Sequence, residues 1–206
     1  EGGGNMDKSM VMKWFQDVLN TEATKIFHNA MYDVCFIRAA GLKIFGKVVD
    51  TMIAGSLVDE NRFRYDLGSM GRDYVGRGKN EAVLAETAKE WGIDAKSEMY
   101  KLPAMYVGAY AEADAQLTLD LWQEMKKEII NQDIEDIFKL ETELFPCLVD
   151  MRFLGVRVDT EAAYELKQKL LTEEKECLRI VQKETGVDAQ IWAARSIAQV
   201  FEKLHL

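Results

Sequence analysis

Thr24-Lys25-Ile26-Phe27-His28, followed at once by Asn29-Ala30-Met31-Tyr32-Asp33, is the stretch that decides the fold of this chain. The first five residues predict a short buried strand, and Asn29 then starts a helix that ends at Gly41. Lys47-Val48-Val49-Asp50-Thr51 predicts a second strand. A junction between a strand and a helix is a common place for site residues, because backbone donors and side chains converge there.

Most of the remaining chain predicts helix. A first helix lies between a cap at Asp7 or Ser9 and a stop at Asn20. Its apolar face carries Met10, Val11, Trp14, Phe15 and Val18. Further helices are expected over about 52–58, 65–70, 80–91, 103–130, 134–154, 159–185 and 193–204. Three glycines are expected to break the chain over 71–78, and 155–158 predicts a turn into a short strand. We place a domain boundary near residues 130–135.

Composition bounds the class of protein. The chain has 206 residues, of which 48% are hydrophobic and 30% charged, which suits one domain or one domain plus part of another. A formal net charge of −9 argues against a protein that coats nucleic acid. It leaves room for an enzyme that grips a few nucleotides in a local pocket and holds divalent cations with carboxylates.

Cysteine usage and hydropathy bound the compartment. The three cysteines show no zinc-ligand spacing, so buried free thiols in a reducing, cytoplasmic compartment are expected. No apolar run is long enough to span a bilayer, so no membrane partner is expected.

Two segments carry candidate chemistry. Tyr110-Ala111-Glu112-Ala113-Asp114 places Tyr110 and Asp114 one turn apart on one helix face, and Asp33 lies one turn after Asn29. Carboxylates from two helices, with a tyrosine hydroxyl nearby, fit part of a two-metal site that cleaves phosphodiesters. A solvated aspartate and a simple hydrogen bond on a helix surface stay open as alternatives.

Both segments resemble motifs of the DEDDy 3′–5′ exonucleases, and most closely those of the proofreading domain of family A DNA polymerases, the DNA polymerase I type and its phage relatives. His28–Asp33 is similar to the N-x-x-Y/F-D motif. Tyr110–Ala115 with Thr118 is similar to the Y-x-x-x-D-A-x-x-T motif, and Arg64–Met70 resembles an R-x-D-L-x-S-L segment. The resemblance implies an α/β fold of the ribonuclease H-like kind.

The resemblance continues beyond the proposed boundary. Leu140 to Asp159 is similar to the segment that leads from the exonuclease into the polymerase domain. The resemblance therefore implies a partial 3′–5′ exonuclease domain over 1–131 and the helical start of a polymerase domain over 132–206.

Residue roles follow from the resemblance. It implies that Asp114 ligates a tightly held Mg²⁺ or Mn²⁺ ion, that Asp33 holds a second ion mostly through water, and that Tyr110 orients the attacking water. Asn29, Tyr32 and Arg64 are implied contacts of the 3′-terminal nucleotides of a DNA single strand. Two ions ~3.5–4 Å apart stabilise the attacking and leaving oxygens of an in-line displacement, and carboxylate oxygens are the ligands such ions prefer.

One motif of this family is missing. No Asp-x-Glu pair precedes Asn29, and the first strands of the family's sheet are not evident. We therefore expect a fragment of a DNA polymerase, lacking those strands, with little nuclease activity alone. An exposed sheet edge predicts a homodimer, strand rearrangement or an edge-covering segment. The remainder of the polymerase chain is the other expected partner.

Rival functions stay open. A non-catalytic nucleic-acid-binding or structural module of the same fold is one, although Asp33, Tyr110 and Asp114 speak against a decayed site. A related exonuclease that acts on RNA is another, against which the polymerase-like segment from Leu140 to Asp159 argues. A helical partner-binding protein has no positive support beyond amphipathic helices.

Overall fold

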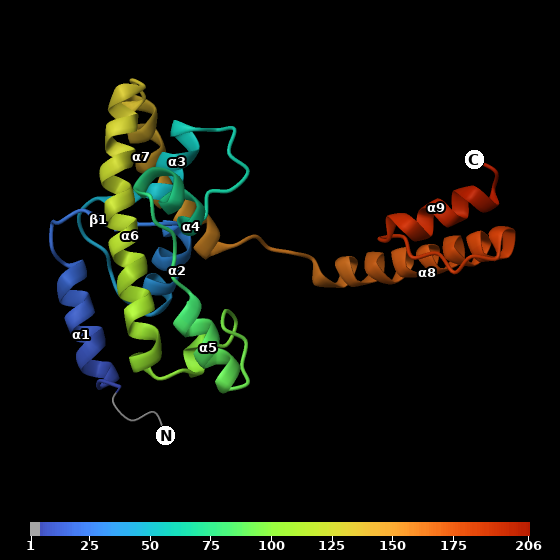
Figure 1. The fold of residues 1–206 in the computed structure, drawn as a ribbon, viewed down its shortest axis with the longest axis horizontal. Coiled ribbons are helices and arrows are strands. Elements are labelled where there is room, and N and C mark those ends of the chain that lie inside the picture. Colours follow the sequence, from blue (N-terminus) through green and yellow to red (C-terminus); the bar gives the residue numbers. More distant parts are fainter. Residues whose placement is uncertain (1–4) are drawn as a thin grey trace. The chain divides into compact units, whose positions relative to one another are not determined.

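The computed structural model describes residues 5–206, which belong to two compact units, Glu1–Leu154 and Gly155–Leu206 (Figure 1). The first unit holds the sheet and all the candidate site residues. The second unit is helical. This division falls later in the chain than the boundary expected near residue 131, and the predicted assignment of the two domains stays a prediction.

Two short strands form the sheet of the first unit. β1 (Lys25–Phe27) pairs in parallel with β2 (Val48–Asp50), with Ile26 opposite Val49. Because the strands are parallel, their carboxyl ends meet at one edge, where helices α2 and α3 begin. Both strands were predicted. Each has one strand neighbour among the described residues, and the predicted absence of further strands stays a prediction.

Helices surround this sheet (Figure 1). Asp7 caps the first helix, as the sequence predicted, and Asp66 caps the fourth. The longest helix starts directly after Pro103, which also agrees with the prediction. The helical elements of this unit are α1 (Lys8–Leu19), α2 (Ala30–Ala39), α3 (Thr51–Val58), α4 (Leu67–Met70), the π-helical η1 (Gly71–Val75), α5 (Ala82–Glu90), the 3-10 helix η2 (Met99–Lys101), α6 (Ala104–Asn131) and α7 (Glu135–Leu154).

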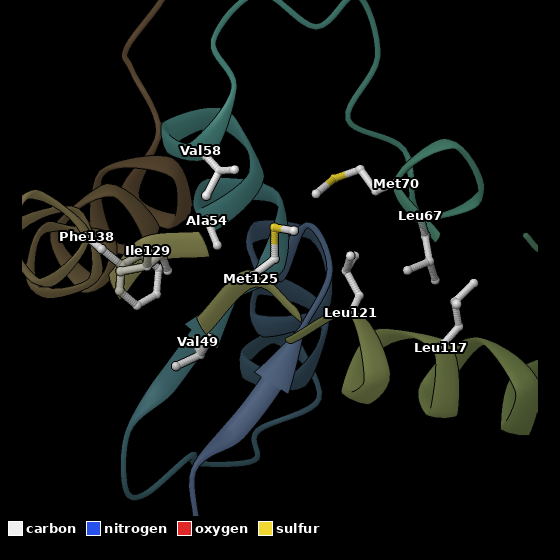
Figure 2. Packing of buried hydrophobic residues seen from close by; sticks show 10 residues of the cluster. All are labelled: Val49, Ala54, Val58, Leu67, Met70, Leu117, Leu121, Met125, Ile129 and Phe138. Carbon is white, nitrogen blue, oxygen red and sulfur yellow. The ribbon is translucent and has the colours of Figure 1, made fainter. Parts of the chain in front are cut away.

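The main core lies where α6 packs against α3, α4 and β2. Figure 2 shows its side chains converging from these elements and from α7. Leu117, Leu121 and Met125 of α6 are almost completely buried, at one face of the helix. Burying each such side chain is worth about 1.5–3 kcal/mol, so this seam fixes α6 against the sheet. Asp114 lies one turn before Thr118 on the same helix, and its position is therefore set by the core.

A smaller cluster fixes α2. Ala30 is fully buried and packs with Phe145 and Val149 of α7. The first turn of α2, which carries Tyr32 and Asp33, is therefore held by α7. Pro146 lies inside α7.

Three expectations about local structure were wrong. Residues 71–75 continue α4 as a π-helical turn, and the chain breaks only at Gly76, which adopts a left-handed φ of 77°. Met10, Trp14 and Val18 on the expected buried face of α1 are exposed, because no described element covers them. Residues 155–158 form no strand, and no strand among residues 5–206 pairs with them.

The second unit is a pair of helices. α8 (Thr160–Thr185) is capped by Asp159, whose carboxylate accepts the Ala162 amide at 3.0 Å, and it ends at Gly186. α9 (Ala194–Lys203) follows. Neither helix has a buried residue. Within residues 5–206, no helix is both long and apolar enough to cross a membrane.

Candidate functional site

Tyr110 and Asp114 of α6 meet at the ammonium group of Lys79. The Lys79 Nζ lies 2.7 Å from the Tyr110 hydroxyl oxygen and 2.6 Å from the Asp114 Oδ2. It also lies 5.0 Å from the centroid of the Tyr110 ring. Tyr110 and Asp114 lie one turn apart on one face of α6, as predicted. Their side-chain oxygens hold the Lys79 ammonium between them.

Glycines bring the Lys79 loop close to α4 and η1. A Cβ on Gly78 would lie 3.0 Å from the Arg72 Cγ and 3.3 Å from the Gly68 carbonyl oxygen. A Cβ on Gly71 would lie 2.6 Å from the Arg77 carbonyl oxygen. These approaches need residues without side chains. Gly71 and Gly78, two of the three glycines of residues 71–78, therefore allow the backbone of this loop to approach α4 and η1 closely.

The Lys79 ammonium and the Tyr110 phenol influence each other's pKa. Burial alone lowers the pKa of Lys79, but its hydrogen bonds to Asp114 and Tyr110 prevail and raise that pKa. Burial raises the pKa of Tyr110, and the Asp114 carboxylate adds to this, while the Lys79 ammonium opposes it. At neutral pH the cluster consists of a charged ammonium, a neutral phenol and Asp114.

Asp50 organises the start of α2. Its Oδ1 accepts the Asn29 backbone N–H at 2.9 Å and its Oδ2 accepts that of Ala30 at 2.8 Å. Oδ1 also accepts the Met52 N–H at 2.8 Å, which caps α3. Asn29 adopts a left-handed backbone with φ of 64°, which asparagine tolerates better than most residues. The buried carboxylate of Asp50 therefore sets the backbone geometry at the start of the segment Asn29–Asp33.

The predicted residues of α2 lie on its more open side. Tyr32 is 58% exposed and packs against Phe36, with ring centroids 4.8 Å apart. Asp33 is half-buried. Its burial raises its pKa, and the nearby Asp50 carboxylate adds to the increase, while a hydrogen bond from its own backbone opposes it. Tyr32 and Phe36 together form an exposed aromatic surface next to this carboxylate.

His28 lies between the end of β1 and Asn29. The His28 Nδ1 lies 2.8 Å from the Thr51 hydroxyl oxygen, which itself lies 3.1 Å from the Phe27 carbonyl oxygen. Its Nε2 is buried and has no hydrogen-bond partner among the described residues. Burial lowers the pKa of His28, and the Lys79 charge adds to this, although Asp50, the Tyr65 carbonyl and Asp66 act in the opposite direction. The His28 ring is therefore neutral at pH 7.

Arg64 lies on the exposed loop before α4. Its neighbour Arg62 is committed elsewhere, because it forms an ion pair with Asp73 at 2.6 Å and lies over the Tyr74 ring. Arg64 has its guanidinium on the surface and influences Asp66, whose pKa is lowered mainly by hydrogen bonds from Ser69. Among residues 5–206, no ion pair engages the Arg64 side chain.

The structure unites only part of the predicted site. Among residues 5–206, no hydrogen bond or ion pair joins Asn29, Tyr32, Asp33 or Arg64 to Tyr110 or Asp114. No group of three or more His, Cys, Asp or Glu side chains in this part of the chain is arranged to hold a metal ion. Asp33 and Asp114 therefore do not complete a two-metal centre with the other described residues.

Two residues important to this site were not predicted as part of it. Lys79 could have been suspected from the basic residues beside the glycines of 71–78. Asp50 could have been suspected because it is a carboxylate at the end of an apolar strand, where functional polar groups often lie. Neither signal specifies the long-range partners, which lie 20 or 21 residues from Asp50 at the start of α2 and 31 or more residues from Lys79 on α6.

Comparisons with known proteins agree on one kind of relative. A family model described as 3′–5′ exonuclease matches residues 4–130. A DNA-directed DNA polymerase of Pseudomonas phage M6 is 32% identical over 99% of this chain and 32% of its own length. The DNA polymerase DpoZ of Salmonella phage PMBT28 is 26% identical over 92% of this chain and 31% of its own.

A bacterial protein shows the same similarity. DNA polymerase I of Chloroflexus aurantiacus is 28% identical over 71% of this chain and 15% of its own length. The chain spans about a third or less of the length of each of these relatives.

Proposed function

This chain belongs to the 3′–5′ exonuclease family of the DNA polymerase A type, and we propose that it serves the proofreading removal of nucleotides from DNA 3′ ends. That family implies an exonuclease domain of the ribonuclease H-like kind. The observation that carries the proposal is the convergence of Tyr110 and Asp114 on one positive charge, at 2.7 and 2.6 Å. Two oxygens that share a cation in a half-buried position suit a site for cation-assisted phosphodiester chemistry.

The site residues have distinct proposed roles. Asp114 and Asp33 are ligands of Mg²⁺ or Mn²⁺, which in the complete enzyme stabilise charge on the phosphate. The described carboxylates do not complete that centre, so further ligands are needed. What this chain supplies itself is position. The Tyr110 hydroxyl orients the attacking water, and Asn29, Tyr32 and Arg64 hold the terminal nucleotides of the single strand.

The substrate contacts fit the chemistry of a DNA end. Tyr32 is exposed and supported by Phe36, as a ring that stacks on a base should be. Arg64 carries an exposed positive charge suited to a phosphate. The net charge of the chain is −9. Tyr32 and Arg64 nevertheless provide a local surface suited to a polyanion such as DNA.

The proposed parent is a DNA polymerase in which this activity accompanies DNA synthesis. The single-stranded 3′ end of DNA and the remainder of the polymerase chain are its proposed partners. The cytoplasm of a bacterial or phage-infected cell is the proposed compartment. We further propose little activity for the 206-residue chain alone, because no Asp-x-Glu pair precedes Asn29.

The nuclease test uses the chain in excess over a 5′-labelled single-stranded oligonucleotide with Mn²⁺. We expect slow shortening from the 3′ end that Asp114→Asn abolishes. Glu112→Gln, which changes an exposed carboxylate on the same helix, is the matched control and should leave the rate unchanged. Brisk degradation by substoichiometric chain would contradict the low activity proposed, and shortening that Asp114→Asn does not alter would contradict the site.

A binding measurement separates catalysis from recognition. In ¹⁵N spectra, a short oligonucleotide should shift the amides of 29–33 and 110–114. Binding at these segments without any cleavage would favour the alternative, a non-catalytic nucleic-acid-binding or structural module of this fold. The Lys79 ammonium on Asp114 is the observation that favours it. The absence of shifts at both segments would contradict either function.

Self-association is also proposed, through the edge of β1 that has no strand partner among the described residues. Unpaired backbone groups at such an edge are a template for pairing with another chain. Sedimentation velocity should show a dimer whose fraction grows with concentration. The variant Ile26→Pro, which alters β1, should reduce the dimer fraction. A strictly monomeric wild type would refute the dimer.

A further inference from the structure

We infer that Lys79 is a built-in counter-cation of the proposed site, which positions Tyr110 and Asp114 and competes with divalent metal for the Asp114 carboxylate. This inference rests on the proposed function, because it concerns the same site. It assigns a role to a residue outside all the motifs that identified the family.

The geometry is that of a cation held by two ligands. Lys79 Nζ is within hydrogen-bond distance of Asp114 Oδ2 and of the Tyr110 hydroxyl, at 2.6 and 2.7 Å. The side chains of Lys79 and Asp114 are only 26% and 23% exposed, so water screens the pair less than an ordinary surface pair. An ammonium is a compact point charge, and in this position it occupies the Asp114 oxygen that a metal ion would take.

The loop is built to deliver this ammonium. Lys79 and Asp114 are separated by 35 residues along the sequence, unlike the ion pair of Lys127 with Glu124, which neighbouring helical turns bring together. Arg77 secures the same loop to α6 through an ion pair with Asp120. Gly78, between these two residues, lies close to α4 and η1, since a Cβ there would be 3.3 Å from the Gly68 carbonyl oxygen and 3.0 Å from the Arg72 Cγ. The contact is therefore a consequence of the fold.

Competition follows from charge. A divalent ion that binds the Asp114 Oδ2 must displace the ammonium, since two positive charges at one oxygen repel each other strongly. The flexible four-carbon stem of lysine allows it to withdraw without a backbone change. In the metal-free chain, the same ammonium keeps the carboxylate and the phenol in place. Removing it should therefore tighten metal binding while loosening these two side chains.

Manganese titration tests the inference without any nuclease assay. Mn²⁺ broadens the amide signals of residues near its site in ¹⁵N spectra, even when it binds weakly. For Lys79→Met, the broadening of 110–114 should reach its midpoint at a Mn²⁺ concentration about threefold to tenfold below that of wild type, as expected for loss of an ion pair of this exposure. Lys79→Arg keeps the charge and should stay near wild type.

The matched control is Arg77→Met. It removes the same charge from the same loop, but from a residue that pairs with Asp120. We expect no more than a small change in the Mn²⁺ midpoint at 110–114. Lys79→Gln provides a second neutral variant if methionine disturbs the loop.

The outcomes are separable. The role of Lys79 would be overturned if the Mn²⁺ midpoint were unchanged or higher in both Lys79→Met and Lys79→Gln. It would also be overturned if no variant showed broadening at 110–114. An equal decrease in Arg77→Met would overturn it as well, because net charge alone would then explain the effect. If Asp114→Asn leaves broadening at 110–114 intact, the proposed metal role of Asp114 fails. If Asp114→Asn removes it and Lys79→Met does not tighten binding, only the inference about Lys79 fails.

Discussion

The carboxylate of Asp50, at the end of β2, accepts the backbone N–H groups of Asn29 and Ala30 at the start of α2, at 2.9 and 2.8 Å. One strand thereby holds the helix that follows the other. Because Asp50 is 7% exposed, these charge-assisted bonds are shielded from water. The segment Asn29–Asp33 is thus anchored at its start by this carboxylate, since the Asn29 side chain makes no capping hydrogen bond.

Asp50→Ala is accordingly expected to be costly. It leaves buried amides without an acceptor and should lower the free energy of unfolding by roughly 2–4 kcal/mol. Urea denaturation followed by circular dichroism measures the change. Asp7→Ala, which removes the exposed cap of α1, should cost only about 0.5–1 kcal/mol. Similar losses in the two variants would show that Asp50 has no special role.

The glycines of the Lys79 loop give a second prediction. A Cβ at Gly71 would lie 2.6 Å from the Arg77 carbonyl oxygen and 2.9 Å from the Leu117 methyl groups. Gly71→Ala should therefore destabilise the chain by about 1–3 kcal/mol, as overpacking does. Gly108→Ala in α6 is the control, because nothing lies within 4 Å of its Cβ. Gly108→Ala should raise the free energy of unfolding by about 0.5–1 kcal/mol. A higher free energy of unfolding for Gly71→Ala, measured by the same urea denaturation, would refute the tight approach.

Stability should depend on pH through His28. The lowered pKa means that folded His28 binds fewer protons than the unfolded chain between that pKa and the ordinary value of 6.5. Stability therefore rises with pH through this window and levels off above it. Denaturation midpoints of wild type between pH 5 and pH 7 should rise more steeply than those of His28→Gln. Parallel pH profiles would exclude His28 as the cause.

Recognition of a single strand should depend on the aromatic surface of α2. Tyr32→Ala should weaken binding of a short DNA oligonucleotide by about 1–3 kcal/mol, the usual worth of one stacked base. Fluorescence anisotropy at low salt measures the affinity. Tyr100→Ala is the control, since Tyr100 is 81% exposed but lies outside the two motifs. A comparable loss in both variants would mean that binding is not localised at α2.

Local pattern alone determined much of this fold. The polar caps at Asp7, Asp66 and Asp159 mark helix starts that the structure confirms, because each side chain accepts the amide three residues ahead. The strand around Ile26 and the period of α6 were predicted on the same grounds, since apolar spacing reflects which face is buried. The motifs at Asn29–Asp33 and Tyr110–Asp114 indicated the family that the comparisons then showed.

Only the tertiary structure decided which groups meet. The sequence placed Tyr110 and Asp114 on one helix face, but their shared partner Lys79 arrives from a loop more than 30 residues earlier. Likewise, the exposure of Met10 and Trp14 on α1 reflects the absence of a covering element among the described residues. Helix periodicity is local and can be read along the chain, whereas the approach of a loop or the covering of a face depends on long-range packing that no short segment encodes.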